Sequence, residues 1–345
     1  MSYTIIIKEG ISIINHCWQL IFLHLLSAIA SFISFFLIVG IPISIAFVIF
    51  GLDLTEILRS KDVTEALKSS IGLLKKYFAM AIVIITSLLF YFTIIFSLWL
   101  FTIAGSLGTI AKMISGEISK FSSKVFFAQG KKLFFPIFGF STIIGVLLLF
   151  LAFLLGILGG GISSIIEIAK TQEAVLALFL GVFFSAIIFI TGLILILIIL
   201  SLTVYGIAYI IFNKVSPLTA FKQTIKYLYT NPSSVGFYSL LLAGSIMTIF
   251  IVLLLGSPIV VIPILGPILS PLYQIASTII QAYINLIIFA STFLYFYKTG
   301  YTPPPVIVES PPSEEENISK EADTSAKQAS EPDQSPQMMA ATEQK

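Results

Sequence analysis

The sequence predicts an all-α polytopic membrane protein with about six transmembrane helices, interfacial amphipathic helices and a disordered C-terminal tail. Of its 345 residues, 57% are hydrophobic and only 10% are charged, whereas a soluble domain carries roughly 25% charged residues. Apolar runs alternate with short charged segments, and each run exceeds the ~20 residues that a bilayer crossing needs. The chain therefore divides into a transmembrane domain, residues 1–300, and an acidic tail rich in Pro, Ser and Glu, residues 301–345, too poor in apolar residues to fold alone.

Six apolar runs define the expected spans. In chain order, they cover residues 18–50, 77–110, 133–158, 174–212, 235–255 and 272–297. The first is long enough to tilt or bend, and Pro42 marks a hinge within it. Gly159–Gly161 should end the third span, and Gly156 and Gly160 form a small-residue pair that we expect to pack against a neighbouring helix.

The connectors between spans predict helices at the membrane surface. The clearest covers Ser216–Pro232, with Ser216 before Pro217 at the first helical position and Asn231 before Pro232 at the end. Its apolar side chains recur at helical spacing on one side: Leu218, Phe221, Ile225 and Leu228.

Residues 62–76 repeat this pattern and are expected to form a second such helix, and residues 3–17 give a fainter copy. A short surface helix is also expected around Val125, in the basic connector 112–132. A true repeat would place 62–76 and 216–230 on the same membrane face, whereas six single crossings place them on opposite faces. The expected contacts with anionic lipid are the lysines Lys68, Lys75, Lys76, Lys222 and Lys226.

Positive charge is concentrated in the transmembrane domain. Residues 1–302 hold 16 of the 19 Lys+Arg but only 8 of the 17 Asp+Glu. Because these basic residues lie beside spans, they indicate contact with anionic headgroups rather than nucleic acid, although an ordinary positive-inside bias explains them equally well. The basic residues that flank the spans favour a cell-membrane protein with both termini in the cytoplasm.

The end of the domain has two unusual features. Residues 256–271 are apolar yet contain four prolines, which suits either a connecting turn or a re-entrant loop shielded from lipid. The sixth span carries one polar stripe at three- and four-residue steps: Ser270, Gln274, Ser277, Gln281 and Asn285. This stripe either bonds to a neighbouring helix or lines a cavity for a polar headgroup or small solute.

Sequence motifs for catalysis and metal binding are absent. There is no P-loop, GxSxG, HExxH or CxxC motif, and Cys17 is the only cysteine. His16 and His24 have no acidic neighbour in sequence except Glu9. No Asp, Glu, Lys or Arg lies in the middle of a span, which argues against an ion-coupled carrier. We therefore expect no catalytic residue, no cofactor and no metal, and a protein that is not an enzyme.

The tail offers two interpretations. Pro311–Pro312 followed by Glu314–Glu316 could recruit a basic protein or a Pro-binding module. The same composition also suits a solvated spacer.

The order of features after residue 202 matches a known layout. Ala220, Phe221 and Lys222 lie in a surface helix that ends at Asn231–Pro232, and a Pro-rich link then joins two spans, the last ending in Thr292–Tyr297. This layout resembles the membrane-domain family associated with glycerophosphoryl diester phosphodiesterases and related YciC-like uncharacterised membrane proteins. The resemblance covers roughly residues 202–297, and more loosely residues 60–300. It implies a membrane location near lipid metabolism, but no activity, because the phosphodiesterase chemistry of that family lies in a separate soluble domain.

Two functions remain open from the sequence. The first is a non-enzymatic integral membrane protein that organises membrane lipids, or partner proteins through its acidic tail. The alternative is a transporter or channel for a small or amphiphilic solute that uses the polar stripe of the sixth span.

Overall fold

The computed structural model describes residues 2–59, 63–261 and 266–300, and 94% of these residues are helical, with no strand among them. Six segments are long and apolar enough to cross a membrane. The protein is therefore an all-α polytopic membrane protein, as predicted. The tail, residues 301–345, lies outside the described residues, and so do the side chains of residues 52–76.

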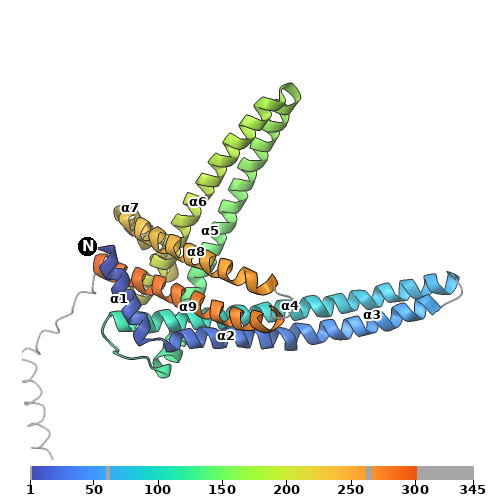
Figure 1. Cartoon of the computed structure of the whole chain (residues 1–345), viewed down its shortest axis with the longest axis horizontal. Helices are drawn as coiled ribbons and strands as arrows, with labels where there is room; N and C mark the ends of the chain where they lie inside the picture. Colours follow the sequence, from blue (N-terminus) through green and yellow to red (C-terminus); the bar gives the residue numbers. More distant parts are fainter. Residues whose placement is uncertain (1, 60–62, 262–265, 301–345) are drawn as a thin grey trace, which may run out of the picture. The chain divides into compact units, whose positions relative to one another are not determined.

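The helices follow one another with short connections (Figure 1). In chain order they are α1 (Tyr3–His16), α2 (Gln19–Phe35), the π-helical turn η1 (Phe36–Gly40), α3 (Ile41–Arg59), α4 (Val63–Ile114), α5 (Ser123–Gln172), α6 (Ala174–Asn213), α7 (Pro217–Thr230), α8 (Pro232–Val261) and α9 (Gly266–Thr299). Helices next to each other in sequence pair along their lengths, as α3 with α4, α5 with α6 and α8 with α9. The N-terminal helix α1 instead packs on α9.

The spans agree with the prediction in number and order. They are Gln19–Gly51, Tyr77–Ile114, Ser123–Gln172, Ala174–Asn213, Pro232–Gly256 and Leu269–Thr299. Within the first span, Pro42 has no N–H to donate to the preceding turn, and the π-helical turn Phe36–Gly40 ends two residues before it. The helical irregularity thus falls where the hinge was predicted.

Two helices are longer than predicted. Residues 63–76 are the start of α4, which continues through the second span, so they do not form a separate surface helix like 217–230. Likewise, α5 begins at Ser123 and passes through Gly159–Gly161 to Gln172, so neither the separate helix around Val125 nor the break at the glycines exists. A glycine costs ~1 kcal/mol relative to alanine within a helix, which is less than the cost of backbone groups left unpaired in an apolar medium.

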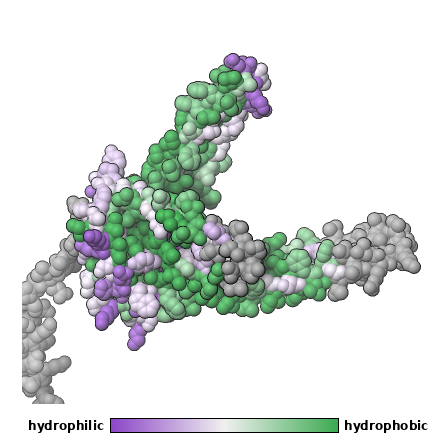
Figure 2. Space-filling model, in the orientation of Figure 1, coloured by the Kyte–Doolittle hydropathy of each residue, from purple (hydrophilic) through white to green (hydrophobic). Residues whose placement is uncertain are grey.

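Most of the length of the spans presents apolar side chains outward. Large residues there are strongly exposed, such as Phe135 at 75% and Phe189 at 71%. Figure 2 shows this as apolar surface along the helices, with hydrophilic residues at the tip of the α5–α6 hairpin and near α1 and α7. Exposure on this scale is expected of a lipid-facing surface.

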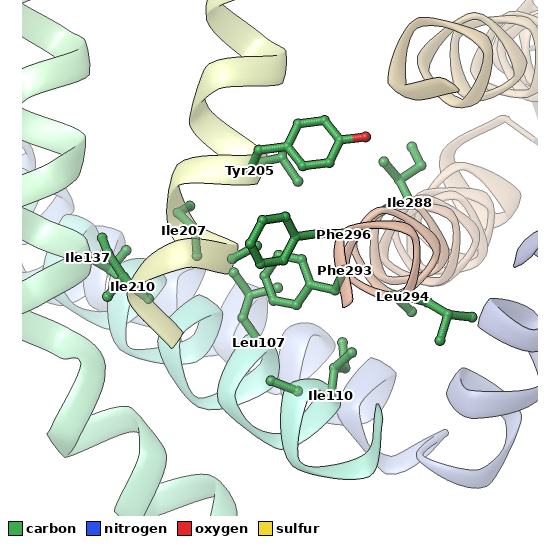
Figure 3. Packing of buried hydrophobic residues seen from close by; sticks show 14 of the residues in the cluster. Leu107, Ile110, Ile137, Tyr205, Ile207, Ile210, Ile288, Phe293, Leu294 and Phe296 are labelled. Carbon is green, nitrogen blue, oxygen red and sulfur yellow. The ribbon is translucent and has the colours of Figure 1, made fainter. Parts of the chain in front are cut away.

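The buried core is confined to one end of the spans, here called the core end. It is built from the N-terminal parts of α2, α5 and α8, the C-terminal parts of α4, α6 and α9, and the helices α1 and α7. Because successive spans alternate in direction along the chain, six crossings would place all these parts on the same side of a membrane. Phe293 and Phe296 of α9 lie at its centre, among residues of α4 and α6 (Figure 3). Most of the aromatic end of the last span is thus buried in the core.

Several of the close approaches between helices are at glycines of the core end. A Cβ added at Gly206 of α6 would lie 2.0 Å from Cζ of Phe140 on α5, and one at Gly108 of α4 would lie 2.6 Å from Cβ of Gln129. By contrast, no described atom lies within 4 Å of a Cβ added at Gly156 or Gly160, so the predicted small-residue contact is wrong.

Candidate functional site

The net charge of the transmembrane domain lies at the core end. By sequence position, this end has ten lysines and two glutamates, whereas the connectors at the opposite end have six basic and six acidic residues. The ten lysines are Lys8, Lys112, Lys120, Lys124, Lys131, Lys132, Lys214, Lys222, Lys226 and Lys298. One of them, Lys298, pairs with Glu9 and ties α9 to α1. The core end is therefore strongly cationic and the opposite end is balanced.

Helix α7 begins and ends where the sequence predicted. Ser216 caps it by accepting a hydrogen bond from the backbone N of Thr219 at 3.4 Å, Pro217 is its first residue, and Asn231 follows its last. The buried residues of the helix are Ala220, Thr224 and Tyr227.

Of the four apolar residues that the sequence places on one side of α7, two contact the core. Phe221 and Leu228 are half-buried against it, but Leu218 and Ile225 are 57% and 48% exposed. Because the side chains of Ala220 and Thr224 are small, this face of the helix lies close to the neighbouring helices. The larger side chains of Leu218 and Ile225 therefore point away from the core. Lys222 and Lys226 are exposed.

A hydroxyl network joins α7 to three other helices. Ser234 of α8 donates to the Tyr227 hydroxyl at 3.0 Å, and that hydroxyl lies 2.8 Å from Oγ1 of Thr299 in α9. Tyr205 of α6 donates to the carbonyl of Ser234 at 2.9 Å. Burial raises the pKa of Tyr227, so its hydroxyl stays protonated and available for these bonds.

A cavity of about 330 Å³ opens where α4, α5, α6 and α9 meet at the core end. Its polar wall contains Lys112, Ser115, Glu117, Gln129, Lys132 and Lys214, and its apolar wall contains Leu133, Ile210 and Phe212, among others. We call it the basic cavity. Its volume is within the range of ligand pockets, about 300–1,000 Å³.

The basic cavity has more positively charged than negatively charged side chains. Lys112 Nζ lies 3.0 Å from Glu117 Oε2, and Ser115 donates to the other oxygen of that carboxylate at 3.4 Å. The hydrogen bond from Lys112, with smaller contributions that include the charge of Lys214, holds the pKa of Glu117 below its usual value. Among the described residues, Lys132 and Lys214 have no ion pair, so the cavity keeps excess positive charge.

Three of the five residues of the predicted polar stripe line a second cavity. Gln274, Ser277 and Gln281 of α9 face a space of about 200 Å³, bounded on α8 by residues that include Ile249 and Val252. The other two stripe residues do not line it: Ser270 is half-buried and Asn285 is exposed. We call this space the α8–α9 groove.

The remaining candidate residues make structural contacts or lie outside the description. His16 Nδ1 is 2.7 Å from the carbonyl of Ser12, and His24 Nε2 is 3.1 Å from Oγ of Ser106. Within the described part of the chain, no group of three or more His, Cys, Asp or Glu residues could hold a metal ion. The predicted lipid contacts at the opposite end, Lys68, Lys75 and Lys76, have side chains outside the described residues.

The sequence analysis did not identify the basic cavity. Its lysines are far apart in the chain, and the only available signal was that Lys112, Lys132 and Lys214 each lie close to the core end of a span. Comparisons with protein-family models, with curated proteins and with solved structures found no match.

Proposed function

We propose that this protein is a non-enzymatic integral membrane protein that binds anionic lipids at its core end and organises them there. The observation that carries the proposal is the exposed surface of α7. The one-sided charge of the domain supports it, because a cluster of lysines beside spans attracts anionic headgroups, at about 1 kcal/mol for each lysine near the surface.

The exposed surface of α7 has two adjacent sectors. At 100° per residue, Leu218, Ile225 and Tyr229 fall together, and Lys222 and Lys226 fall beside them. All five are exposed, Tyr229 by 88%. An apolar sector next to a basic sector suits a helix that lies in the membrane interface, with its apolar side chains among acyl chains and its lysines extended to headgroups.

The core end would face the cytoplasm. Lysine-rich connectors are retained on that side of the membrane, and the cytoplasmic leaflet carries the anionic lipids that these lysines would bind. The acidic composition of residues 301–345 supports a further role for them, the recruitment of a basic protein. The resemblance to the phosphodiesterase-associated membrane domains fits a role near lipid metabolism and carries no activity to this chain.

The double substitution Lys222→Glu, Lys226→Glu tests this function. Because it reverses two charges next to headgroups, the full chain purified in mild detergent should retain several-fold less anionic lipid, measured by mass spectrometry of co-purified lipids. Lys222→Arg, Lys226→Arg keeps the charge and should retain as much as the wild type. Lys170→Glu at the opposite end should have little effect. Unchanged retention of anionic lipid in the double Glu variant would refute the proposal.

Transport of a small or amphiphilic solute is the second candidate, and the α8–α9 groove is the observation that favours it. If the groove conducts, Gln281→Leu should lower solute flux into liposomes by about tenfold, since a polar group that would contact the solute is removed from the groove lining. Glycerol, choline and glycerol 3-phosphate are suitable probes. Asn285→Leu is the matched control, because Asn285 belongs to the same stripe but does not line the groove. Equal flux in the two variants and the wild type, with folding intact, would exclude this role for the groove.

A further inference from the structure

We infer that the basic cavity is a saturable binding site for a phosphate group, of the kind carried by the headgroup of a phosphomonoester lipid. The inference deepens the proposed function and rests on it, because it assigns one lipid class to one site at the core end.

The position of the cavity matches the depth of lipid phosphates. Lys112 lies in the last turn of α4, and Lys214 directly follows the last residue of α6. Both therefore stand where an apolar span gives way to a polar connector. Headgroup phosphates occupy this boundary, and lysines at helix ends extend toward it.

The chemistry of the walls suits a phosphate joined to an apolar body. Lys132 and Lys214 are ammonium groups without a carboxylate partner among the described residues, while Glu117 engages Lys112. Lysine binds phosphate as a point charge with three donors. The other wall, with Leu133, Ile210 and Phe212, offers apolar contact for the glycerol and acyl portions of a lipid but nothing for a free ion.

The backbone of Lys214 provides an independent argument. It has φ 52° and ψ 36°, the left-handed conformation, and among the described residues it is the only non-glycine with positive φ. Glycine usually occupies this position after a helix, because a Cβ is unfavourable there. A lysine held in this conformation at the edge of a cationic cavity points to a requirement for its side chain.

The strained backbone allows a test in which loss of binding cannot result from loss of folding. Lys214→Gly removes the ammonium group and also relieves the backbone, so its thermal unfolding temperature should equal or exceed that of the wild type. Lys132→Gln removes a second ammonium group. Lys131→Gln is the matched control, because Lys131 is the exposed neighbour of Lys132 and does not line the cavity.

The full chain in an uncharged detergent would be titrated calorimetrically with dioctanoyl phosphatidic acid, with inorganic phosphate and with dioctanoyl phosphatidylcholine. We expect saturable binding of phosphatidic acid, and a loss of affinity of about tenfold in Lys214→Gly and in Lys132→Gln, the usual effect of removing one charge-assisted hydrogen bond. Lys131→Gln should match the wild type. Phosphatidylcholine, which has no net charge, should bind far more weakly.

The ligands distinguish the source of the phosphate. Tighter binding of phosphatidic acid than of inorganic phosphate assigns the site to a lipid, and equal affinity assigns it to a free phosphate. The inference is overturned if Lys214→Gly and Lys132→Gln bind phosphatidic acid as tightly as the wild type, or if Lys131→Gln loses as much affinity as they do. These titrations leave α7 unchanged, so failure here is separate from failure of the lipid-retention test.

Discussion

Phe140 of α5 lies directly against Gly206 of α6. Phe140 is fully buried, and a Cβ at Gly206 would lie 2.0 Å from its ring. The helices can approach this closely only because residue 206 has no side chain. The contact could not be foreseen at Gly206, since a small residue allows close approach but does not specify which neighbour occupies the space.

Gly206→Ala should therefore destabilise the protein. The added methyl group would displace the Phe140 ring or separate the helices, at a cost of ~1–3 kcal/mol. Thermal unfolding in detergent, followed by tryptophan fluorescence or circular dichroism, would measure the change. Gly156→Ala is the matched control, because no described atom lies within 4 Å of its Cβ position, and it should be neutral or slightly stabilising. Equal unfolding temperatures for the two variants would contradict the role assigned to Gly206.

At the scale of the helix, the ends of α7 followed from local chemistry. Ser216, Pro217 and Asn231 act on their own backbone or on residues one turn away, so their effect is independent of the rest of the fold. Which residues of the same helix pack on the core did not follow, because periodicity groups Leu218 and Ile225 with Phe221 and Leu228 on one side and does not specify the neighbour that each one contacts. In the structure, the face of α7 that packs on the core is the one with the small side chains of Ala220 and Thr224 and with Tyr227, whose hydroxyl contacts Thr299 of α9.

For α4 and α5, by contrast, the predicted helix ends are wrong, because both helices are longer than predicted. The charged residues before Tyr77 and the glycines at 159–161 predict the ends of spans, but the helices pass through both. Helix propensity is a weak preference of up to ~1 kcal/mol per residue, whereas each backbone hydrogen bond given up near a membrane leaves two polar groups to satisfy. Composition therefore marks where a span can end, and the hydrogen-bonded backbone decides whether it does.

At the scale of the whole transmembrane domain, six spans bring α1, α7, the α4–α5 connection and the end of α9 to one side. The repeat suggested by residues 62–76 does not alter this, since those residues begin α4 at the opposite end of the second span. The two ends of the domain then differ in charge and in the contacts they make. The core end combines the buried core, the basic cavity and α7.

Cysteine labelling can test this topology. Cys17 is buried, which raises the pKa of its thiol to about 11, so it should react slowly with maleimides near neutral pH. Single cysteines at Thr219 of α7 and at Thr171 of the α5–α6 tip, both exposed, should react with a membrane-impermeant maleimide from opposite sides. The proposed orientation places Thr171→Cys outside the cell and Thr219→Cys in the cytoplasm. Labelling of both from the same side would contradict the six-span topology.

The sequence alone determined the fold class, the number and order of the spans and the ends of α7. These properties depend on transfer to lipid and on backbone hydrogen bonds, both of which are local along the chain. Only the tertiary structure decided which side chains meet. It placed glycines against the rings of Phe101, Phe126 and Phe140, and it determined which face of α7 is buried. It also determined which three residues of the polar stripe line the α8–α9 groove. It also brought Lys112, Lys132 and Lys214 to one cavity, because such convergence depends on how separate helices pack, and an apolar span has almost the same composition whichever neighbour it contacts.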